Sequence, residues 1–345
     1  MKNMDAAREG CGAFVRLEPE GLQFQCQAGA TLLSAALAAG IDLPYECASG
    51  GCGSCRARLL EGQVRSLWPD APGLSHRDRL KGDRILCCQS VAQTDCVVQL
   101  RAGPTAPPVR PALVPARVKS LRMLNHEVMH LVLTAGEAMH FLPGQFVLFD
   151  LPNGIGRRAY SMSNANARDG CLEFLIKRKP QGAAGTYLFE TLRVNDTLEV
   201  DGPYGRSWLR EERTDQDLVL LAGGSGLAPV WSIAQAALMA QANRRIHLYF
   251  CVNKAQDLFW QDELLAMQAH APNLRLHLVL AEAPEVPLQD QRLGLAAAVL
   301  AQDFGGRLAH ELYMAGPPGM IDSVLRELVS TGMAQADRVF FDRFC

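Results

Sequence analysis

Apolar and polar positions follow three successive patterns along the 345-residue chain. In the first pattern, short β-rich runs predict strands at residues 13–17, 22–26, 84–88 and 96–100. An apolar helix is expected over residues 32–39, because Thr31 suits the N-cap and Gly40 suits the position beyond the last turn. A polar insertion at residues 68–83 precedes the last two strands.

The second pattern begins after a proline-rich linker. Five prolines fall within twelve residues and favour extended, semi-rigid backbone: Pro104, Pro107, Pro108, Pro111 and Pro115. Beyond them, β-rich runs punctuated by Gly, Pro and Asn predict strands at residues 128–134, 146–151, 171–177 and 197–200. Several short strands at this spacing predict a small barrel.

The third pattern alternates apolar runs with helical stretches. Strands are expected at residues 218–222, 246–252, 274–280, 311–314 and 338–341. Helices are expected at residues 230–240, 259–269, 293–302 and 320–329. This alternation predicts a parallel sheet covered by helices. The expected organisation is a first domain at residues 11–103, a linker at 104–115, a barrel domain at 116–213 and an α/β domain at 214–345.

Composition and charge narrow the class of protein. Apolar residues make up 48 % and charged residues 20 %, as in folded globular proteins. With 34 basic and 36 acidic residues, the chain lacks the basic excess of nucleic-acid binders, so no nucleic-acid partner is expected. Residues 218–243 carry no charge and are long enough to span a bilayer. Glycines at 223, 224 and 226 and Pro229 break this run, which favours a strand, a loop and a helix over a membrane span.

The cysteines are the unusual feature of the composition. Eight of the eleven lie in the first 96 residues: Cys11, Cys26, Cys47, Cys52, Cys55, Cys87, Cys88 and Cys96. Residues 1–10 are polar and lack the apolar stretch of a secretory signal, which favours a cytoplasmic protein. A metal or redox site is therefore expected rather than a disulfide scaffold.

One cysteine loop has the spacing of an iron–sulfur site. Cys47, Cys52 and Cys55 follow C-x4-C-x2-C, and a fourth cysteine lies about 33 residues further on, at Cys87 or Cys88. This is the spacing of plant-type [2Fe–2S] ligands. The loop glycines at 50, 51 and 53 would allow positive φ angles and a close approach of the backbone to the cluster. A four-cysteine zinc site is the alternative, but it usually has two C-x2-C pairs and only one is present.

The segment resembles the plant-type ferredoxin family, which implies a β-grasp fold. In that family the fourth ligand directly precedes a Gln, which favours Cys88, before Gln89, over Cys87. Adjacent residues of a strand also point to opposite faces, so only one of the two is expected to reach the cluster. The remaining cysteines are expected to be ordinary buried residues: Cys11, Cys26, Cys96, Cys171 and Cys251.

Two segments of the barrel region resemble the flavin motifs of the ferredoxin–NADP reductase superfamily. The first segment reads Arg-Ala-Tyr-Ser at residues 158–161. The resemblance implies that Arg158 pairs with the FAD pyrophosphate, that Tyr160 packs on the flavin and that Ser161 hydrogen-bonds near its N5. The second segment spans residues 180–188, in which Gly182, Gly185 and Thr186 are candidates for the pyrophosphate. Relatives carry a hydroxyl where this chain has Gly185, so either the loop shifts by one residue or backbone N–H groups make the contact. A simple β-turn is the alternative. Residues 202–205 resemble a structural turn that closes the barrel.

Three further segments resemble the nicotinamide-binding half of that superfamily. A strand leads into Gly223, Gly224, Ser225 and Gly226 and then into a helix, an arrangement that lets a dinucleotide approach the backbone. A second loop contains Gly316, Pro317 and Pro318, preceded by Ala315 where relatives often have Cys. The resemblance places Phe344 near the flavin and Asp342 near the hydride-transfer region. NADPH carries a 2′-phosphate, which would need cationic residues in the loop after the strand expected at residues 246–252. In that loop the positive charge of Lys254 is offset by the negative charge of Asp257, which favours NADH over NADPH.

Together the motifs resemble the NADH-dependent reductases of bacterial multicomponent oxygenases. Such a protein would pass electrons from NADH through FAD and a [2Fe–2S] cluster to an aromatic-ring oxygenase or hydroxylase, or to its Rieske or plant-type ferredoxin. FAD accepts an electron pair and a cluster accepts one electron, so the protein's contribution is to align and tune the cofactors. The cluster rim at residues 49–54 is the expected docking face of a monomer with transient partners. A deoxysugar dehydratase or cytochrome as acceptor, and a non-enzymatic electron carrier, are the alternatives.

Overall fold

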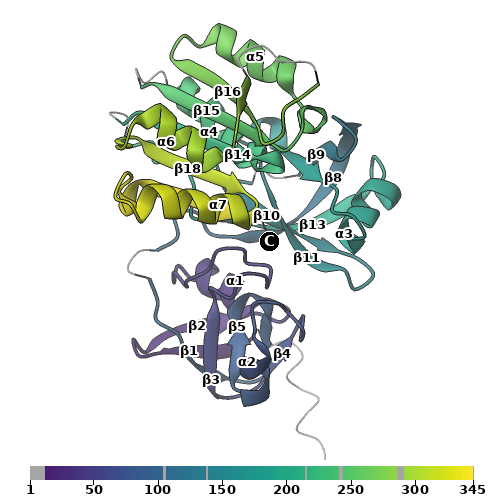
Figure 1. The fold of residues 1–345 in the computed structure, drawn as a ribbon. Coiled ribbons are helices and arrows are strands. Elements are labelled where there is room, and N and C mark those ends of the chain that lie inside the picture. Colours follow the sequence, from purple (N-terminus) through teal and green to yellow (C-terminus); the bar gives the residue numbers. More distant parts are fainter. Residues whose placement is uncertain are drawn as a thin grey trace, which may run out of the picture. The chain divides into compact units, whose positions relative to one another are not determined.

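The computed structural model describes residues 12–103, 106–136, 139–213, 216–240, 244–285 and 291–344. These residues form three large sheets and one two-stranded sheet (Figure 1). Each large sheet contains the strands of one region of the chain, so each of the three sequence patterns folds into a sheet of its own.

The first sheet has five strands and one helix packed on it. In sheet order the strands are β2 (Leu22–Cys26), β1 (Ala13–Glu18), β7 (Cys96–Gln99), β3 (Arg56–Glu61) and β5 (Arg84–Leu86). β1 pairs with β7 in parallel, and the other pairs are antiparallel. Helix α1 (Leu32–Ala38) begins as expected, because the Thr31 side chain accepts a hydrogen bond from the Ser34 amide at 3.1 Å. The two-stranded sheet pairs β4 (Val64–Ser66) with β6 (Ser90–Ala92).

Two features of the first domain differ from the expectation. The polar insertion contains a helix, α2 (His76–Lys81), whose N-cap Ser75 accepts from the Asp78 amide at 3.2 Å. The strand expected over residues 84–88 ends at Leu86, and Cys87–Gln89 form a 3₁₀ turn. The α2 helix has no buried residue, so it lacks the apolar stripe on which a helix prediction rests.

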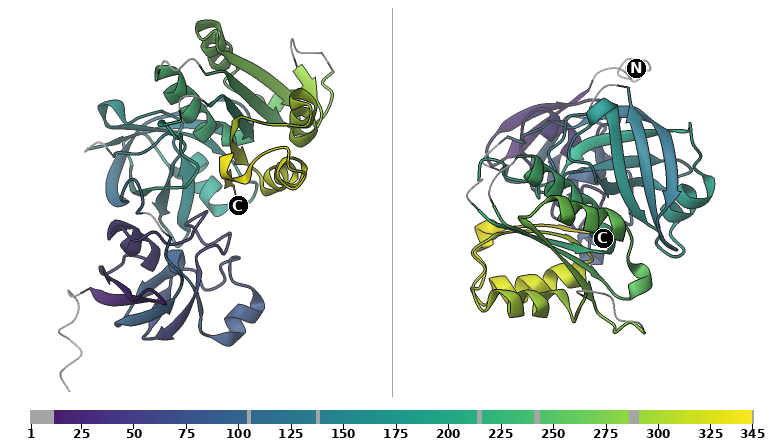
Figure 2. Two further views of the ribbon diagram at one scale, coloured as in Figure 1. Left: turned by 90° about the vertical axis from the view of Figure 1, so that its left-hand side faces the viewer. Right: turned by 90° about the horizontal axis from the view of Figure 1, so that it is seen from above.

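The second sheet has six strands and the barrel-like curvature seen in Figure 2. In sheet order they are β11 (Gly156–Ser161), β10 (Phe146–Leu151), β13 (Thr197–Tyr204), β8 (Ala112–Met123), β9 (Val128–Ala135) and β12 (Cys171–Lys177). The strand β8 begins at Ala112, inside the range expected to be linker. A short helix α3 (Ala183–Thr186) continues into a π-helical segment, Tyr187–Thr191.

The third sheet has six parallel strands with helices on both faces. In sheet order they are β17 (Gln291–Leu293), β16 (Leu274–Leu280), β15 (Ile246–Val252), β14 (Leu218–Gly223), β18 (Glu311–Gly316) and β19 (Val339–Arg343). The helices α4 (Leu227–Met239) and α5 (Gln261–His270) contribute to the core on one face. On the other face lie α6 (Ala296–Phe304) and α7 (Pro318–Val324), the latter continued by the π-helical Leu325–Val329.

The order of the third sheet locates a binding edge. The chain starts at β14, moves outward through β15 and β16, and then returns to β18 on the other side of β14. Ligands of such sheets bind at the carboxyl ends of the strands where the order reverses, which here is between β14 and β18. Within the described ranges no helix has the length and apolarity needed to cross a bilayer.

Candidate functional site

The four cysteines predicted as cluster ligands come together in the first domain. The sulfurs of Cys55 and Cys88 lie 3.3 Å apart. The thiols of Cys47 and Cys52 interact with each other, and the Cys52 amide donates to the Cys47 sulfur at 3.4 Å. The Ser54 amide donates to the Cys52 sulfur, also at 3.4 Å. Iron binds thiolates, and N–H groups directed at sulfur stabilise that charge, so these residues fit a [2Fe–2S] cluster.

Hydrogen bonding within the cysteine pairs shifts their acidity. The hydrogen bond with the Cys47 thiol is the largest influence that lowers the pKa of Cys52, to about 4. The hydrogen bond with Cys88 likewise lowers the pKa of Cys55 below its usual value. The same hydrogen bonds raise the pKa values of Cys47 and Cys88, so one proton is shared within each pair. Iron binds the thiolate form of cysteine, so all four would lose their protons on ligation.

The loop glycines serve two different purposes. Gly50 (φ +94°) and Gly53 (φ +79°) adopt the left-handed conformation, as expected, whereas Gly51 does not and Ala48 (φ +51°) does. A Cβ atom on Gly53 would lie 2.8 Å from the carbonyl oxygen of Gly73 in the polar insertion. The insertion therefore packs directly on the cysteine loop, so it forms part of the cluster's surroundings.

The choice between Cys87 and Cys88 has a different physical basis from the one expected. The argument from alternating strand faces is wrong, because both residues lie in the 3₁₀ turn and both are buried. The contact with the Cys55 sulfur is made by Cys88. This geometry favours Cys88 as the fourth ligand, in agreement with the resemblance.

The cysteines outside the cluster loop are mostly packing residues. Cys26, Cys96 and Cys251 are buried, as expected. Cys171 was expected to be buried, but it is only partly buried. It is the first residue of β12, and its sulfur contacts the Lys119 amine at 3.5 Å. Cys11 lies outside the described residues.

The first flavin segment forms strand β11. Ser161 is buried and Tyr160 is half-buried. The Tyr160 ring lies 4.7 Å from the Phe149 ring, and Phe149 in turn contacts Phe174 at 4.9 Å, so aromatic packing fixes the position of the tyrosine. The hydroxyl of Ser163, two residues beyond Ser161, is buried with no hydrogen-bond partner among the described protein groups. A polar ligand beside this strand would satisfy it.

The two adjacent arginines of this segment differ in their partners. Arg157 pairs with Asp201 at 2.9 Å and lies 3.6 Å from Asp150, so its charge is offset by two carboxylates. Arg158 donates to the Arg157 carbonyl at 2.9 Å, which leaves its guanidinium charge without a neutralising carboxylate in that contact. The Arg158 guanidinium also lies 5.4 Å from the centre of the Trp68 ring. A guanidinium suits the geometry of a pyrophosphate, so Arg158 fits the role that the resemblance implies.

The second flavin segment forms a helix start rather than a simple turn. Gly182 is the N-cap of α3, Gly185 is buried in its first turn, and Thr186 is exposed. The Thr186 amide donates back to the Gly182 carbonyl at 2.9 Å. First-turn amides of a helix lack intrahelical acceptors, which favours the alternative in which backbone N–H groups replace the missing hydroxyl. The turn expected over residues 202–205 is partly strand, since β13 extends to Tyr204.

The glycine loop and the Gly-Pro-Pro loop meet at the carboxyl edge of the third sheet. A Cβ atom on Gly226 would lie 2.0 Å from the carbonyl oxygen of Ala315, and one on Gly223 would lie 2.8 Å from the Met320 sulfur. Gly224 has φ +54° and no atom within 4 Å of its Cβ position, so the space above its backbone is open. The glycines thus permit close packing between the loops and leave backbone accessible to a dinucleotide.

Asp342 and Phe344, in and just after β19, lie at the same edge of the third sheet. The Phe344 amide donates to the Gly316 carbonyl at 2.9 Å, and Asp342 lies beside Ala315 in the register of β18 and β19. Phe344, Asp342 and the Gly316–Pro318 segment are therefore close to one another. Ser225 stands in the 3₁₀ turn between β14 and α4, at this same edge.

The loop after β15 carries little positive charge for a coenzyme phosphate. The Lys254 amine lies 3.7 Å from a Glu282 oxygen, and the Lys254 amide donates to the Asp257 carboxylate at 3.0 Å. The carboxylates therefore offset the lysine's charge in this loop.

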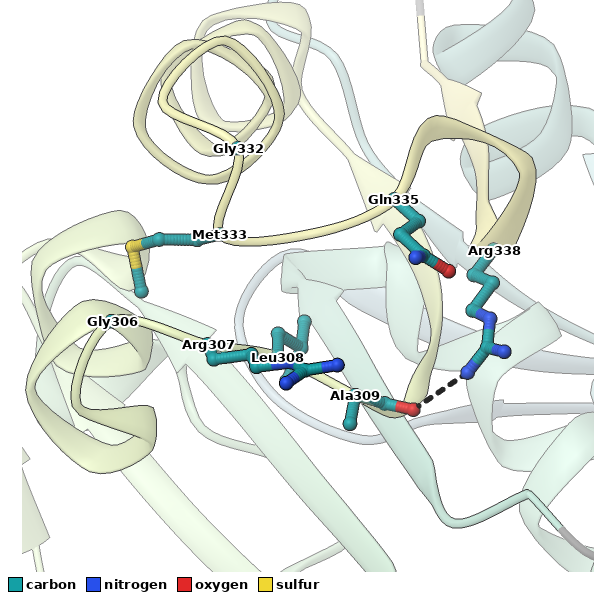
Figure 3. Close-up of a pocket in the computed structure, with 8 residues that line it drawn as sticks. All are labelled: Gly306, Arg307, Leu308, Ala309, Gly332, Met333, Gln335 and Arg338. Carbon is teal, nitrogen blue, oxygen red and sulfur yellow. Dashed lines mark hydrogen bonds between the residues drawn. The ribbon is translucent and has the colours of Figure 1, made fainter.

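One cavity of about 230 Å³ lies away from this edge. It is lined by residues that precede β18 and β19, among them Ala309 and Arg338, whose guanidinium donates to the Ala309 carbonyl at 3.0 Å (Figure 3). It therefore lies at the amino ends of these strands, opposite the predicted dinucleotide edge.

Comparisons with known protein families and relatives assign the same three cofactor-binding regions to the chain. Models of the 2Fe-2S iron-sulfur cluster binding domain, the oxidoreductase FAD-binding domain and the oxidoreductase NAD-binding domain match residues 15–93, 115–208 and 220–326. The chain is 47 % identical to the ferredoxin–NAD(+) reductase component of the alkene monooxygenase system of Xanthobacter autotrophicus, over 94 % of this chain and 98 % of that relative. The chain belongs to the ferredoxin–NAD(P)+ reductase family.

Further comparisons support this placement of the reductase. It is 38 % identical to a ferredoxin–NAD(P)(+) reductase of Metapseudomonas resinovorans, over 92 % of this chain and 96 % of that one. It superimposes with a TM-score of 0.87 on the solved ferredoxin reductase in carbazole 1,9a-dioxygenase, with 35 % identity and coverage of 96 % and 98 % of the two chains. The reductase is therefore an oxidoreductase that uses FAD, a [2Fe–2S] cluster and a nicotinamide dinucleotide, as the motifs predicted.

Sequence reasoning missed three structural contributions to the site. It did not predict α2 or the packing of Gly73 on the cysteine loop, because neither belongs to a motif. The capping pair Ser75 and Asp78 was the available signal for α2. It also did not separate the roles of Arg157 and Arg158 by their partners, since the contact with Asp201 spans 44 residues.

Proposed function

We propose that this reductase passes electrons from NADH through FAD and the [2Fe–2S] cluster to the terminal component of a multicomponent oxygenase, or to that system's small ferredoxin. The supporting observation is the joining of a four-cysteine site to a flavin strand and a dinucleotide edge in one chain. The relatives named above belong to an alkene monooxygenase system and a carbazole dioxygenase, which supports an oxygenase as acceptor.

Separate sets of residues would hold the cluster and the flavin. Cys47, Cys52, Cys55 and Cys88 would ligate the iron, while amides of the loop donate to the sulfurs. Arg158 would hold the FAD pyrophosphate and Tyr160 would pack on the flavin. When bound, FAD accepts an electron pair as a hydride and releases the electrons singly, which matches the one-electron capacity of the cluster.

The dinucleotide edge would orient the coenzyme. The partly exposed backbone at Gly224 and the start of α4 would receive the coenzyme's pyrophosphate, because helix N-termini favour anions. The Gly316 loop, held by Phe344, would flank the nicotinamide. Gly182, Gly185 and Thr186 would border the FAD pyrophosphate at the start of α3. We infer that Ser161 donates a hydrogen bond near the reacting flavin nitrogen and that Asp342 helps to orient the reacting groups.

The coenzyme would be NADH. A 2′-phosphate needs cationic partners in the loop after the second strand, and here the Lys254 charge is offset by Glu282 while Asp257 would repel a phosphate. An adenosine ribose without that phosphate meets no such penalty.

The test asks whether electrons from NADH pass from the flavin to the cluster before they reach an external acceptor. Wild-type protein and the variant Cys47→Ser are compared for NADH-driven reduction of ferricyanide, which accepts electrons from flavin, and of cytochrome c, which we expect to accept them from the cluster. The variant should keep ferricyanide reduction and lose at least nine-tenths of cytochrome c reduction. Equal cytochrome c rates in the two proteins would contradict a route through the cluster. A wild-type protein with zinc and no iron would contradict the proposed function altogether.

A further inference from the structure

The insertion that packs on the cysteine loop gives the first domain an uneven distribution of charge. Residues 56–84 contain seven Lys and Arg residues against four Asp and Glu, whereas the rest of residues 12–103 contains two against five. The domain as a whole is therefore neutral, but the part that follows Cys55 is cationic.

The burial of the paired side chains increases this contrast at the surface. Arg56 pairs with Asp78 at 3.0 Å, and the arginine side chain is 50 % exposed against 14 % for the carboxylate. Arg58 pairs with Asp83, with 48 % exposure against 30 %. The cations thus lie on the outside of each pair. An approaching protein would meet mainly guanidinium groups.

Helix α2 adds unpaired charge and an apolar side chain to this surface. Arg77 and Lys81 are exposed and adjoin each other, because residues four apart share a helix face. Leu80, three residues after Arg77, is 75 % exposed. An exposed leucine bordered by cations suits the centre of a protein contact, since interface cores are apolar and their rims charged.

This cationic surface borders the cluster site. Arg56 directly follows the ligand Cys55 and contacts α2 through Asp78. The Gly73 amide, two residues before the α2 cap, donates to the Gly50 carbonyl at 2.9 Å. Figure 1 shows α2 beside β5, the edge strand of the same sheet. A protein bound on α2 would therefore lie next to the cysteine loop.

We propose that α2 and the exposed arginines of β3 form the docking surface for the electron acceptor, and that the acceptor presents an acidic surface around an apolar patch. The inference rests on the proposed function, since it names the face through which the cluster is approached. Opposite charges raise the association rate of such transient pairs, and salt screens the effect.

The experiment uses the holoenzyme and two haem proteins of opposite charge. Acidic cytochrome b5 and basic cytochrome c each take one electron per haem, so one NADH reduces two haems and releases one proton. The double variant Arg77→Glu/Lys81→Glu is compared with Arg16→Glu/Arg101→Glu, which changes the net charge equally on β1 and just after β7. Leu80→Ser tests the apolar centre, and NADH-driven bleaching of the cluster is followed in every variant.

The α2 double variant should lower kcat/KM for cytochrome b5 about tenfold at low salt and raise it for cytochrome c. The control should stay within about twofold of the wild type, and the tenfold difference should shrink as salt rises. Leu80→Ser should lower kcat/KM for cytochrome b5 at all salt concentrations.

Three results would overturn the inference. The first is equal cytochrome b5 kinetics in the α2 variant and the control. The second is slower bleaching of the cluster in the α2 variant, because the surface would then serve the chain's own flavin region. The third is the absence of NADH-driven cluster bleaching in the wild type, which would overturn the proposed function and the docking surface with it.

Discussion

The contact between Gly226 and Ala315 offers a sharp test of how the dinucleotide edge is built. A Cβ atom on Gly226 would lie 2.0 Å from the Ala315 carbonyl oxygen and 2.5 Å from its carbonyl carbon. Ordinary contacts of this kind begin near 3.4 Å. The variant Gly226→Ala must therefore separate the β14 and β18 loops by more than 1 Å, because both opposing atoms are backbone and cannot rotate away.

We expect this separation to affect both stability and coenzyme binding. Forced overpacking costs about 1–3 kcal/mol, and the rigid opposing backbone places this case at the upper end. A loss of that size in a domain of this size lowers the midpoint of thermal unfolding by about 4–10 °C. The KM for NADH should rise at least tenfold, since the loop amides no longer face the coenzyme together.

A neighbouring glycine supplies the matched control. Gly319 lies in α7 beyond the same loop, and no atom lies within 4 Å of its Cβ position. The variant Gly319→Ala should leave KM unchanged and raise stability by up to about 1 kcal/mol, the helix preference of Ala over Gly. The two variants are compared by calorimetry and by NADH-dependent ferricyanide reduction. If Gly226→Ala matches Gly319→Ala in both assays, the close packing of the two loops is not what the glycine provides.

Three further predictions concern the cluster, pH and the coenzyme. Cys88→Ser should abolish the cluster's visible absorption while Cys87→Ser retains it; the reverse result would move the fourth ligand to Cys87. Burial, with the nearby His247 ring, lowers the pKa of His277 to about 4, below its unfolded value of 6.5. The unfolded chain therefore binds more protons between these values, so stability should fall by about 1–2 kcal/mol from pH 6.5 to 4 after allowance for solvent screening. In denaturant titrations His277→Gln should flatten that slope, and an unchanged slope would assign it to other groups. Asp257→Arg should lower the KM for NADPH at least fivefold in steady-state assays, and no change would place the adenosine ribose elsewhere.

The sequence was sufficient for elements whose pattern is local and buried. The strands at residues 246–252 and 274–280 were predicted to the residue, because each is a short run in which apolar, strand-favouring residues predominate between helical stretches. Strand β8 was not among the expected strands. Its first residues were assigned to the linker because of Pro111 and Pro115, although proline is tolerated in a strand where its N–H is not needed.

The residues of the candidate site were likewise predictable where the signal is local in sequence and not where it depends on the fold. Motif spacing was enough to nominate Cys47, Cys52 and Cys55, because a cluster ligand set is compact in sequence. The preference for Cys88 by contact with Cys55 depends on a turn that no spacing rule contains. The cationic surface of α2 and β3 could not be predicted from a net charge near zero. It arises from ion pairs in which the carboxylates are the more buried partners.

The central claim is that electrons from the coenzyme pass through flavin to the [2Fe–2S] cluster in one chain. An anaerobic titration with NADH, followed by visible absorption and by electron paramagnetic resonance, tests it most directly. Flavin bleaching accompanied by the rhombic signal of one reduced [2Fe–2S] cluster per chain is the predicted result. A bleached flavin with no cluster signal at any NADH concentration would contradict the account.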